Sequence, residues 1–325
     1  KQPDKIGENS MDKEQYFAEK RVEYKEFILD KINTHSEQFG DFGDLETRSM
    51  YLIGLQPLYF NPSEFQEGFY DAVRGQDWQS VNDYLYQEMC YWLIPHNEGG
   101  SGYDHCFYFY QALEAFACGA ERVLESVYPL ELGLTENGYR FYVAGSNLVI
   151  AQYYHDAELL KQAVGTANKF IGSRASKWER YAIAFLLNLI NKEFEAANDN
   201  LLNVCKGYGR VEKPMLAAED VCIPAHGLYC IARSWLTAEE FAKLAMPKHK
   251  AFLQDYAQWR LENPAPTLKP YMVYPEDMDI FNRIYAMPTA KTTLTQERFT
   301  ENSKLQPVID CAKMHEIFVN DLRNC

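Results

Sequence analysis

The chain of 325 residues is long enough to form one large domain, or two modest ones, around a real hydrophobic core. Its 46 acidic and 32 basic residues give a net charge of −14, which argues against binding to nucleic acid or to anionic membranes, because both require a basic surface. The aromatic content of 14 % argues against a disordered chain, and no apolar run approaches the roughly 18 residues of a membrane span. We expect a globular protein that binds neither nucleic acid nor membrane.

The distribution of polar, apolar and charged residues along the sequence suggests how the chain is organised. Residues 1–10 are polar and contain no apolar leader, and a helical pattern begins at Met11. We expect residues 1–10 to be a linker remnant and residues 11–325 to form a single helical domain, with an acidic, aromatic-rich half (11–138) and a near-neutral half (139–325). The eight cysteines show no C-x-x-C pair, which is typical of reduced thiols in a cytoplasmic protein.

Apolar residues recur at three- and four-residue spacing along most of the chain, which predicts an all-α fold. Asp77 is expected to cap the helix that follows it, and Gly75 and Gly119 to end the helices that precede them. The segment 176–191 is apolar on more than one side and should form an enclosed, central helix. Helices are predicted at 16–32, 62–75, 78–94, 107–119, 123–127, 141–154, 156–171, 176–191, 194–206, 222–235, 238–245, 248–262 and 305–323.

Three segments consist of an apolar helix, a tight polar break and an amphipathic helix, which is the pattern of an αα-hairpin: 69–85, 113–127 and 185–202. The breaks are unequally spaced, so a regular repeat array is not expected. We predict irregularly stacked antiparallel hairpins with little or no strand. Residues 271–274 could form a short strand or an extended segment, and the polar tail at 288–302 is expected to be a surface excursion.

Standard catalytic signatures are missing: the sequence contains no G-x-G-x-x-G, Walker A, H-E-x-x-H or G-x-S-x-G motif. Cys222, His226 and Cys230 recur every four residues, so on a helix they would share one face with ligands that suit zinc. A single helix cannot surround a tetrahedral ion, however, and we favour small side chains packed in the interior. We therefore expect no metal or other cofactor.

Two further groups of polar residues could carry chemistry. The glycine-rich loop at 96–105 could be an active-site loop or a solvated connection, and we favour the connection. The run His155, Asp156, Glu158 is better explained as the first turn of a helix, where acidic residues complement the helix dipole. No catalytic residue is assigned. The polar residues of the loop are His96, Glu98, Ser101, Asp104 and His105.

The negative charge is concentrated in one segment. Residues 62–138 contain 13 acidic and two basic residues, whereas residues 139–325 are nearly neutral. Acidic side chains interleaved with Tyr and Trp are typical of a surface that binds a basic protein, because the charges steer the encounter and the aromatic rings anchor it. An acidic, solvated face over an aromatic core is the alternative. The candidate partner-binding residues are Asp71, Asp77, Trp78, Asp83, Glu98, Tyr103 and Asp104.

Three segments carry a family resemblance: WERYAIAFLLNLINKEFEAANDNLL (178–202), IPAHGLYCIARSWL (223–236) and YMVYPEDMDIF (271–281). Over roughly residues 140–285 the pattern resembles the immunity protein 49 family, helical immunity proteins of bacterial polymorphic toxin systems. The resemblance implies a cytoplasmic protein that binds a cognate toxin domain and blocks its active site or substrate channel. Such toxins are often nucleases delivered by type VI secretion or contact-dependent systems. The family has no catalytic residues to transfer.

The first hypothesis is therefore a non-enzymatic immunity protein whose acidic segment binds a toxin domain with a basic surface. A second is a scaffold or regulator of the tetratricopeptide kind that binds a peptide or protein in a groove. A third is a metal-dependent enzyme that uses the loop at 96–105 or the group Cys222, His226 and Cys230.

Overall fold

The computed structural model describes residues 14, 15, 17–19, 22, 66–95, 102–208, 220–276, 279–298 and 303–324. Across these residues the chain is predominantly helical with one two-stranded sheet, so the predicted all-α fold with little or no strand is confirmed. None of the described helices is both long enough and apolar enough to cross a bilayer. The predicted linker remnant lies outside the described residues, as does most of the first predicted helix.

The first described hairpin consists of α3 (Gln66–Gly75) and α4 (Trp78–Leu93). The break between them lies at Gln76, whose φ is +55°, and at Asp77. The Asp77 carboxylate accepts a hydrogen bond from the backbone N–H of Ser80 at 3.1 Å and so caps α4, as predicted. α4 ends two residues before Pro95, which cannot continue a helix.

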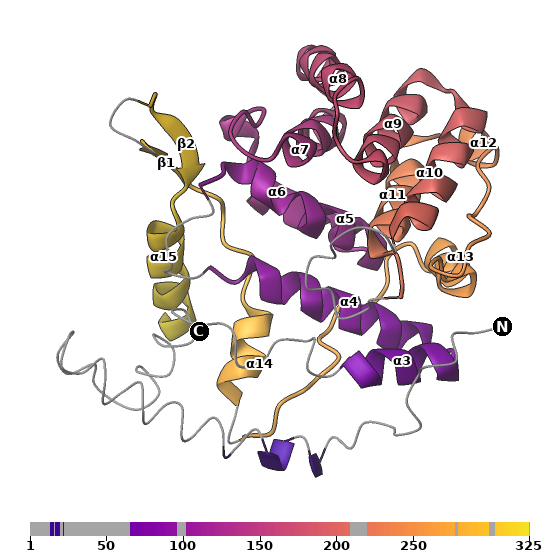
Figure 1. The fold of residues 1–325 in the computed structure, drawn as a ribbon. Helices are drawn as coiled ribbons and strands as arrows, with labels where there is room; N and C mark the ends of the chain where they lie inside the picture. Colours follow the sequence, from indigo (N-terminus) through magenta and orange to yellow (C-terminus); the bar gives the residue numbers. More distant parts are fainter. Residues whose placement is uncertain are drawn as a thin grey trace.

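α5 (Phe109–Cys118) is the central helix, entered through the short 3-10 helix η3 (His105–Tyr108). All but two of its residues, Tyr110 and Gln111, are buried. Gly119 ends it with a φ of +84°, in the conformation that favours glycine. Figure 1 shows α3 and α4 on one side of α5 and α7 and α8 on the other, with α9, α10 and α11 at one end and the sheet at the opposite end. α5 is therefore largely enclosed by the elements that pack against it.

α5 packs closely against α11 (Ile223–Trp235). A Cβ atom at Gly227 of α11 would lie 2.2 Å from the carbonyl oxygen of Leu113 on α5. Because the obstacle is backbone, it cannot move aside as a side chain could. The approach of the two helices thus depends on the glycine at position 227.

Four consecutive helices follow: α7 (Arg140–Tyr153), α8 (Ala157–Ile171), α9 (Lys177–Asn191) and α10 (Phe194–Tyr208). Asp156 caps α8 and Ser176 caps α9 through their side-chain oxygens. α9 packs against α7, α8, α10 and α11, but about half of its residues are not buried and α5, not α9, is the central helix (Figure 1), so the predicted central position was wrong. α9 forms a hairpin with α10 through Lys192, which has a φ of +63°.

Three of the remaining elements lie between α5 and α7, and the others follow α11 towards the C-terminus. They are η4 (Glu121–Val123), α6 (Leu124–Val127), η5 (Leu130–Leu132), α12 (Ala238–Phe241), α13 (Gln254–Glu262), α14 (Asp279–Ala286), β1 (Leu294–Glu297), β2 (Gln306–Ile309) and α15 (Cys311–Asn324). β1 and β2 pair antiparallel, with Leu294 opposite Ile309 and Glu297 opposite Gln306.

Several predicted boundaries in this part were wrong. The helices predicted at 238–245 and 248–262 are shorter, because α12 ends at Phe241 and α13 begins only at Gln254. The helix predicted at 305–323 begins at Cys311, after β2, where Asp310 accepts a hydrogen bond from the Lys313 N–H at 3.0 Å. The tail at 288–302 is not simply a surface excursion: it contains β1, and its Thr292 is buried. Residues 271–274 are extended without forming a strand.

Replacement of Gly227 by Ala tests the contact between α5 and α11. The added Cβ would collide with the Leu113 carbonyl oxygen, so we expect a loss of about 1–3 kcal/mol in the free energy of unfolding, measured by urea denaturation. The matched control is Gly165→Ala, because Gly165 lies within α8 and a Cβ there has no neighbour within 4 Å. The control should be neutral or slightly stabilising. Equal losses in both variants would contradict the close-contact explanation.

Candidate functional site

Of the predicted partner-binding residues, Asp77 and Trp78 lie at the turn between α3 and α4, and Asp71 lies on α3. Asp71 forms an ion pair with Arg74 on the same helix. Asp77 is exposed, although its carboxylate is already used to cap α4. Trp78 is half-buried, with its ring centroid 6.5 Å from that of Tyr256 on α13. This turn is accessible to a partner, but two of its charges have partners within the protein.

Asp83 is not a surface residue, and the prediction that it contacts a partner was wrong. It is 4 % exposed, and its carboxylate interacts with the Lys269 ammonium at 3.6 Å and with the Gln79 amide at 2.6 Å. Burial raises the pKa of Asp83, and the hydrogen bond from Gln79 and the charge of Lys269 oppose that rise. Asp83 thus connects α4 to the extended segment that follows α13.

The prediction for Asp104 was also wrong, because its side chain is only 1 % exposed. One carboxylate oxygen accepts hydrogen bonds from the backbone N–H groups of Glu136 and Asn137 at 2.7 and 2.8 Å. The other accepts from the Cys106 N–H at 2.9 Å and caps η3. Asp104 therefore fixes the loop before α7 to the start of η3. This pairing spans more than thirty residues of sequence, and no local pattern indicates it.

The predicted site residues do not form one surface. Tyr103 is half-buried, and its carbonyl accepts a hydrogen bond from the Ile309 N–H of β2 at 2.9 Å. β2 lies at the opposite end of the molecule from α3 (Figure 1), so Tyr103 and Asp77 cannot contact the same small partner segment. Glu98 lies outside the described residues, as do His96 and Ser101.

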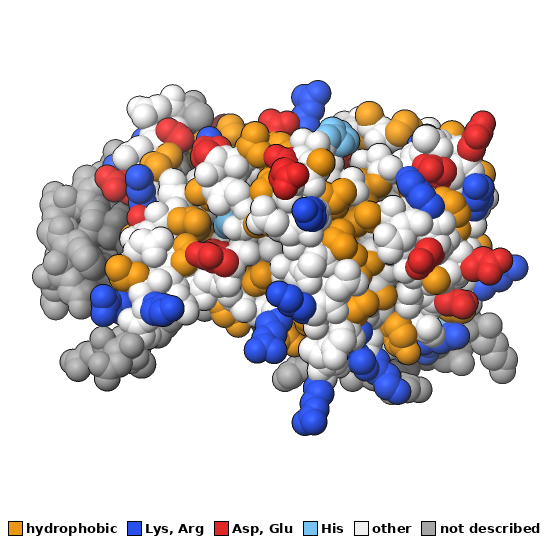
Figure 2. All heavy atoms as spheres, turned by 90° about the horizontal axis from the view of Figure 1, so that it is seen from above, with side chains coloured by type: hydrophobic (Ala, Val, Ile, Leu, Met, Phe, Trp, Pro, Cys, Tyr) orange, Lys and Arg blue, Asp and Glu red, His pale blue; other side chains and the backbone are white. Residues whose placement is uncertain are grey.

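Within the described residues of 62–138, the fold removes part of the acidic charge from the surface. Four of this segment's carboxyl groups are buried, and basic residues from later in the chain approach others: Lys291 lies 2.5 Å from Glu131, and Arg260 attracts Glu121. Figure 2 shows acidic and basic side chains interspersed over one face of the molecule. Sequence counting missed these pairs because their members lie far apart in the chain. The four buried groups are Asp83, Glu88, Asp104 and Glu114.

Glu88 on α4 and Glu114 on α5 are buried close to each other between the two helices. Burial, followed by the charge of Glu88, raises the pKa of Glu114 well above its ordinary value of 4.5. One oxygen of Glu114, Oε2, has no hydrogen-bond partner. The folded state therefore favours the protonated form of Glu114.

The group Cys222, His226 and Cys230 lies on α11 or next to it. The His226 ring is stacked on Phe252 with 4.1 Å between centroids, and its Nε2 accepts a hydrogen bond from the Leu253 N–H at 3.1 Å. Burial lowers the pKa of His226 to about 3. The hydrogen bond to Nε2 thus fixes the start of α13. His226 is a buried residue with a structural role, as we favoured from the sequence. The described residues contain no group of three or more His, Cys, Asp or Glu arranged to hold a metal ion.

The structure also places His105 and His155, the other two histidines singled out in the sequence. His105 Nε2 lies 3.1 Å from the carbonyl oxygen of Gly133, and burial lowers the pKa of the ring. His155 is exposed at the turn before α8. Asp156 accepts hydrogen bonds from the N–H groups of Glu158 and Leu159 at 2.9 Å, so the interpretation of this run as the first turn of a helix is confirmed.

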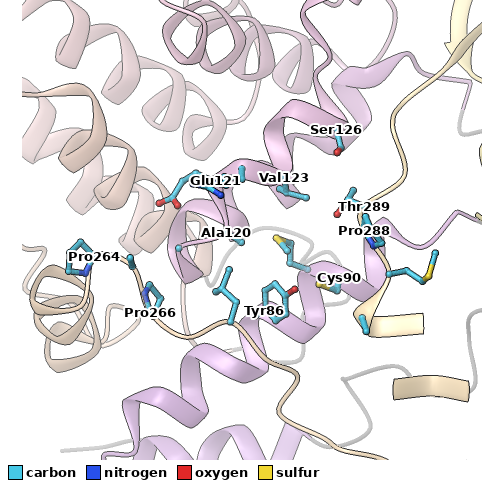
Figure 3. Close-up of a pocket in the computed structure, with 17 residues that line it drawn as sticks. Tyr86, Cys90, Ala120, Glu121, Val123, Ser126, Pro264, Pro266, Pro288 and Thr289 are labelled. Atoms are coloured by element: carbon cyan, nitrogen blue, oxygen red, sulfur yellow. The ribbon is translucent and has the colours of Figure 1, made fainter. Parts of the chain in front are cut away.

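A groove of about 650 Å³, here called the proline groove, lies where α4, the connection from α5 to α6 and two extended segments meet. Figure 3 shows Tyr86 and Cys90 of α4 on one side and Glu121, Val123 and Ser126 on the other, with prolines at both ends. This volume lies within the range of about 300–1,000 Å³ of ligand-binding pockets. The lining includes Tyr86, Met89, Cys90, Ala120, Glu121, Val123, Ser126, Pro264, Pro266, Leu268, Met287, Pro288 and Thr289.

The wall formed by residues 264–268 is held in place from the core. Arg260, at the end of α13, donates from Nε to the Ala117 carbonyl at 2.9 Å and from a terminal nitrogen to the Asn263 carbonyl at 2.5 Å. Gly119 lies so close to Pro266 that a Cβ would come within 2.8 Å of its ring. These contacts place the prolines beside α5 and keep the groove open.

The cysteine of the proline groove is not an activated nucleophile. Burial raises the pKa of Cys90 to about 12, so the thiol stays protonated, and it pairs with the Tyr86 hydroxyl. Burial also raises the pKa of Glu121, against the attraction of Arg260. An apolar side chain or an extended apolar segment fits this lining, whose charged residues are Glu121 and Arg122.

Carboxylates and tyrosines adjoin the groove through Glu121, and together we call them the acidic rim: Glu121, Glu125, Glu131, Tyr153 and Tyr154. The Tyr153 hydroxyl donates to Glu125 at 3.2 Å, and the Tyr154 hydroxyl donates to the Tyr128 carbonyl at 2.7 Å. Leu130 between them is 52 % exposed. The glutamates belong to the segment that the sequence predicted to bind a partner, but the tyrosines come from α7 and its end.

Comparison with known proteins adds no relative: no protein-family model matches the chain, and no match was found among curated proteins or solved structures. The resemblance to the immunity protein 49 family therefore stays a prediction.

Replacement of Asp104 by Asn tests its structural role. Asn offers one acceptor oxygen where three backbone N–H groups now donate to the carboxylate, so we expect a loss of about 2–4 kcal/mol in the free energy of unfolding. Asp77→Asn is the control, since Asn caps helices as well as Asp does, and it should cost less than about 0.5 kcal/mol. Urea denaturation of both variants gives the comparison. A small effect of Asp104→Asn would refute the role.

Replacement of Glu114 by Gln tests the buried carboxyl pair. Glu114 binds its proton more tightly in the folded than in the unfolded chain, so its contribution to stability falls as the pH rises above 4.5 and through the folded-state pKa. Gln is neutral throughout. We expect Glu114→Gln to lose less stability than the wild type between about pH 5 and 8, and to be the more stable at the upper end. Exposed Glu195→Gln should follow the wild type, and a Glu114→Gln curve parallel to both would rule out the effect.

Proposed function

We propose that the protein is an immunity protein, which binds a cognate secreted toxin domain in the cytoplasm and covers its active site. The observation that carries this proposal is the proline groove with its acidic rim. Tight protein interfaces combine an apolar anchor in a pocket with flanking charges that steer the encounter, and the two features adjoin at Glu121. The protein itself supplies no chemistry in this function.

The partner that suits this surface has a basic segment with an apolar side chain at its centre. The apolar side chain would enter the groove against Leu268, which is 38 % exposed, and the basic groups would approach Glu125. A nuclease toxin has such basic surfaces, because its substrate is a polyanion. This proposal moves the binding surface away from Asp83 and Asp104 but keeps it partly within residues 62–138.

The cytoplasmic location is part of the proposal. The seven described cysteines are all free thiols, and most of them are buried. Free thiols suit a reducing compartment, in which an immunity protein protects the cell that makes the toxin.

The test uses a candidate toxin domain, to be sought among the products of the genes that neighbour the gene for this protein. Co-expression of this protein with the toxin domain should rescue the growth of the cells. Calorimetry of the two proteins should give a dissociation constant that increases with salt concentration. The double variant Glu125→Lys, Leu268→Asp should weaken binding by about 10- to 100-fold, because it removes both the charge and the apolar contact.

The matched control is Glu195→Lys, Val273→Asp, which makes the same changes at exposed positions outside the groove. Its dissociation constant should match that of the wild type. No binding to the toxin domain, or equal weakening in the two double variants, would refute the proposal.

A further inference from the structure

A second concave region lies on the side of the molecule where α3, α9, α10 and α13 meet. It consists of two cavities of about 590 and 580 Å³, and His249 lines both. We call the two together the lysine trough. Trp78, Lys248 and Lys250 line the first cavity, and Lys177, Trp178 and Lys206 line the second.

The trough is cationic in a protein whose net charge is −14. The side chains of Lys177, Lys206, Lys248 and Lys250 are all exposed, and no carboxylate among the described residues lies within ion-pair distance of them. Among the described residues that line the two cavities, Asp255 is the one acidic residue. Four unpaired ammonium groups around one concavity attract an anion.

His249 lies at the junction of the two cavities. Its Nδ1 accepts a hydrogen bond from the Ala251 N–H at 3.2 Å, so the neutral ring carries its proton on Nε2 and can donate it. Burial lowers the pKa of His249, and the charges of Lys250 and Lys206 lower it further. The same positive potential that disfavours a proton on His249 favours a ligand with negative charge.

Two tryptophans add recognition of a different kind. Trp78 is half-buried at one cavity, so part of its ring is accessible. Trp178 is 4 % exposed at the other, and its indole N–H is buried without a hydrogen-bond acceptor. An unsatisfied buried donor is costly and points to an acceptor that the protein does not supply.

We infer that the lysine trough binds a nucleoside polyphosphate, with the phosphates among Lys206, Lys248, His249 and Lys250 and the base against Trp78. Lysine ammonium groups bind phosphate as point charges, and bases stack on aromatic rings. The volume of each cavity lies within the range of about 300–1,000 Å³ of small-molecule sites. An acidic peptide would use the lysines but not the stacking surface. The inference does not depend on the immunity function, because the proline groove is lined by other residues.

Isothermal titration calorimetry of the full chain with ATP, inorganic triphosphate and adenosine tests the inference. ATP should bind most tightly, triphosphate more weakly and adenosine weakest, and the ATP affinity should fall with salt. Lys248→Ala, Lys250→Ala should reduce ATP affinity by about tenfold or more. Trp78→Leu should reduce it by about five- to hundredfold, towards the affinity for triphosphate.

The matched control is Lys161→Ala, Lys169→Ala, which removes two exposed charges from α8, outside the trough. Its ATP affinity should equal that of the wild type, and urea denaturation of each variant checks the fold. Several results would overturn the inference: no heat from ATP, equal loss in the α8 control, or triphosphate binding as tightly as ATP with no effect of Trp78→Leu. Binding of a polyglutamate peptide in place of ATP would assign the trough to an acidic protein segment and overturn it too.

Discussion

The structure depends on the burial of α5. The helix is covered by α4, α7 and α11, and the contact with α11 is so close that position 227 must lack a side chain. Because α5 ends at Cys118, its last carbonyls have no donor within the helix and can accept hydrogen bonds from other parts of the chain. The Ala117 carbonyl accepts from the Tyr256 hydroxyl and from Arg260, both at 2.9 Å, and these two bonds attach α13 to the core. The wall of the proline groove follows directly from α13, so the groove is a consequence of how α5 is packed.

Burial also explains why the acidic segment 62–138 presents less negative charge on the surface than its sequence predicts. A count along the sequence treats each Asp and Glu as a surface group, but this fold uses several as internal connectors. Asp104 holds a distant loop, Asp83 holds the segment around Lys269, and Glu114 is enclosed between helices. A carboxylate buried among backbone N–H groups is stabilised by them and loses its value for attracting a partner. Charge concentrated in sequence is therefore a weak guide to charge concentrated in space.

The parts of the fold that could be predicted are those with a local physical cause. The caps at Asp77 and Asp156 and the left-handed end at Gly119 act within one helical turn, so the sequence pattern contains them. Boundaries set by distant contacts could not be predicted. α13 begins where His226, on another helix, accepts the Leu253 N–H, and no residue near Leu253 indicates this.

About half of the residues that line the proline groove lie in the segment that the sequence predicted to bind a partner. Tyr86, Cys90 and Glu121 lie in the segment expected to bind a partner, although none of them was selected. Pro264, Pro266 and Pro288 lie in extended segments without periodicity, so nothing in the sequence brings them to α4. A groove assembled from segments this far apart becomes visible only once the chain is folded.

The two concave regions share α13, and this bears on whether they act together. Gln254, at its first turn, lines the lysine trough, and Pro264, just beyond its end, lines the proline groove. Between them Tyr256 and Arg260 are bound to the Ala117 carbonyl inside the core, which ties the helix to the most enclosed element of the protein. A coupling between sites requires an element with two arrangements that both ligands bias. α13 is fixed at its centre by buried hydrogen bonds, so it favours one arrangement, and substitutions in the two regions should have additive effects.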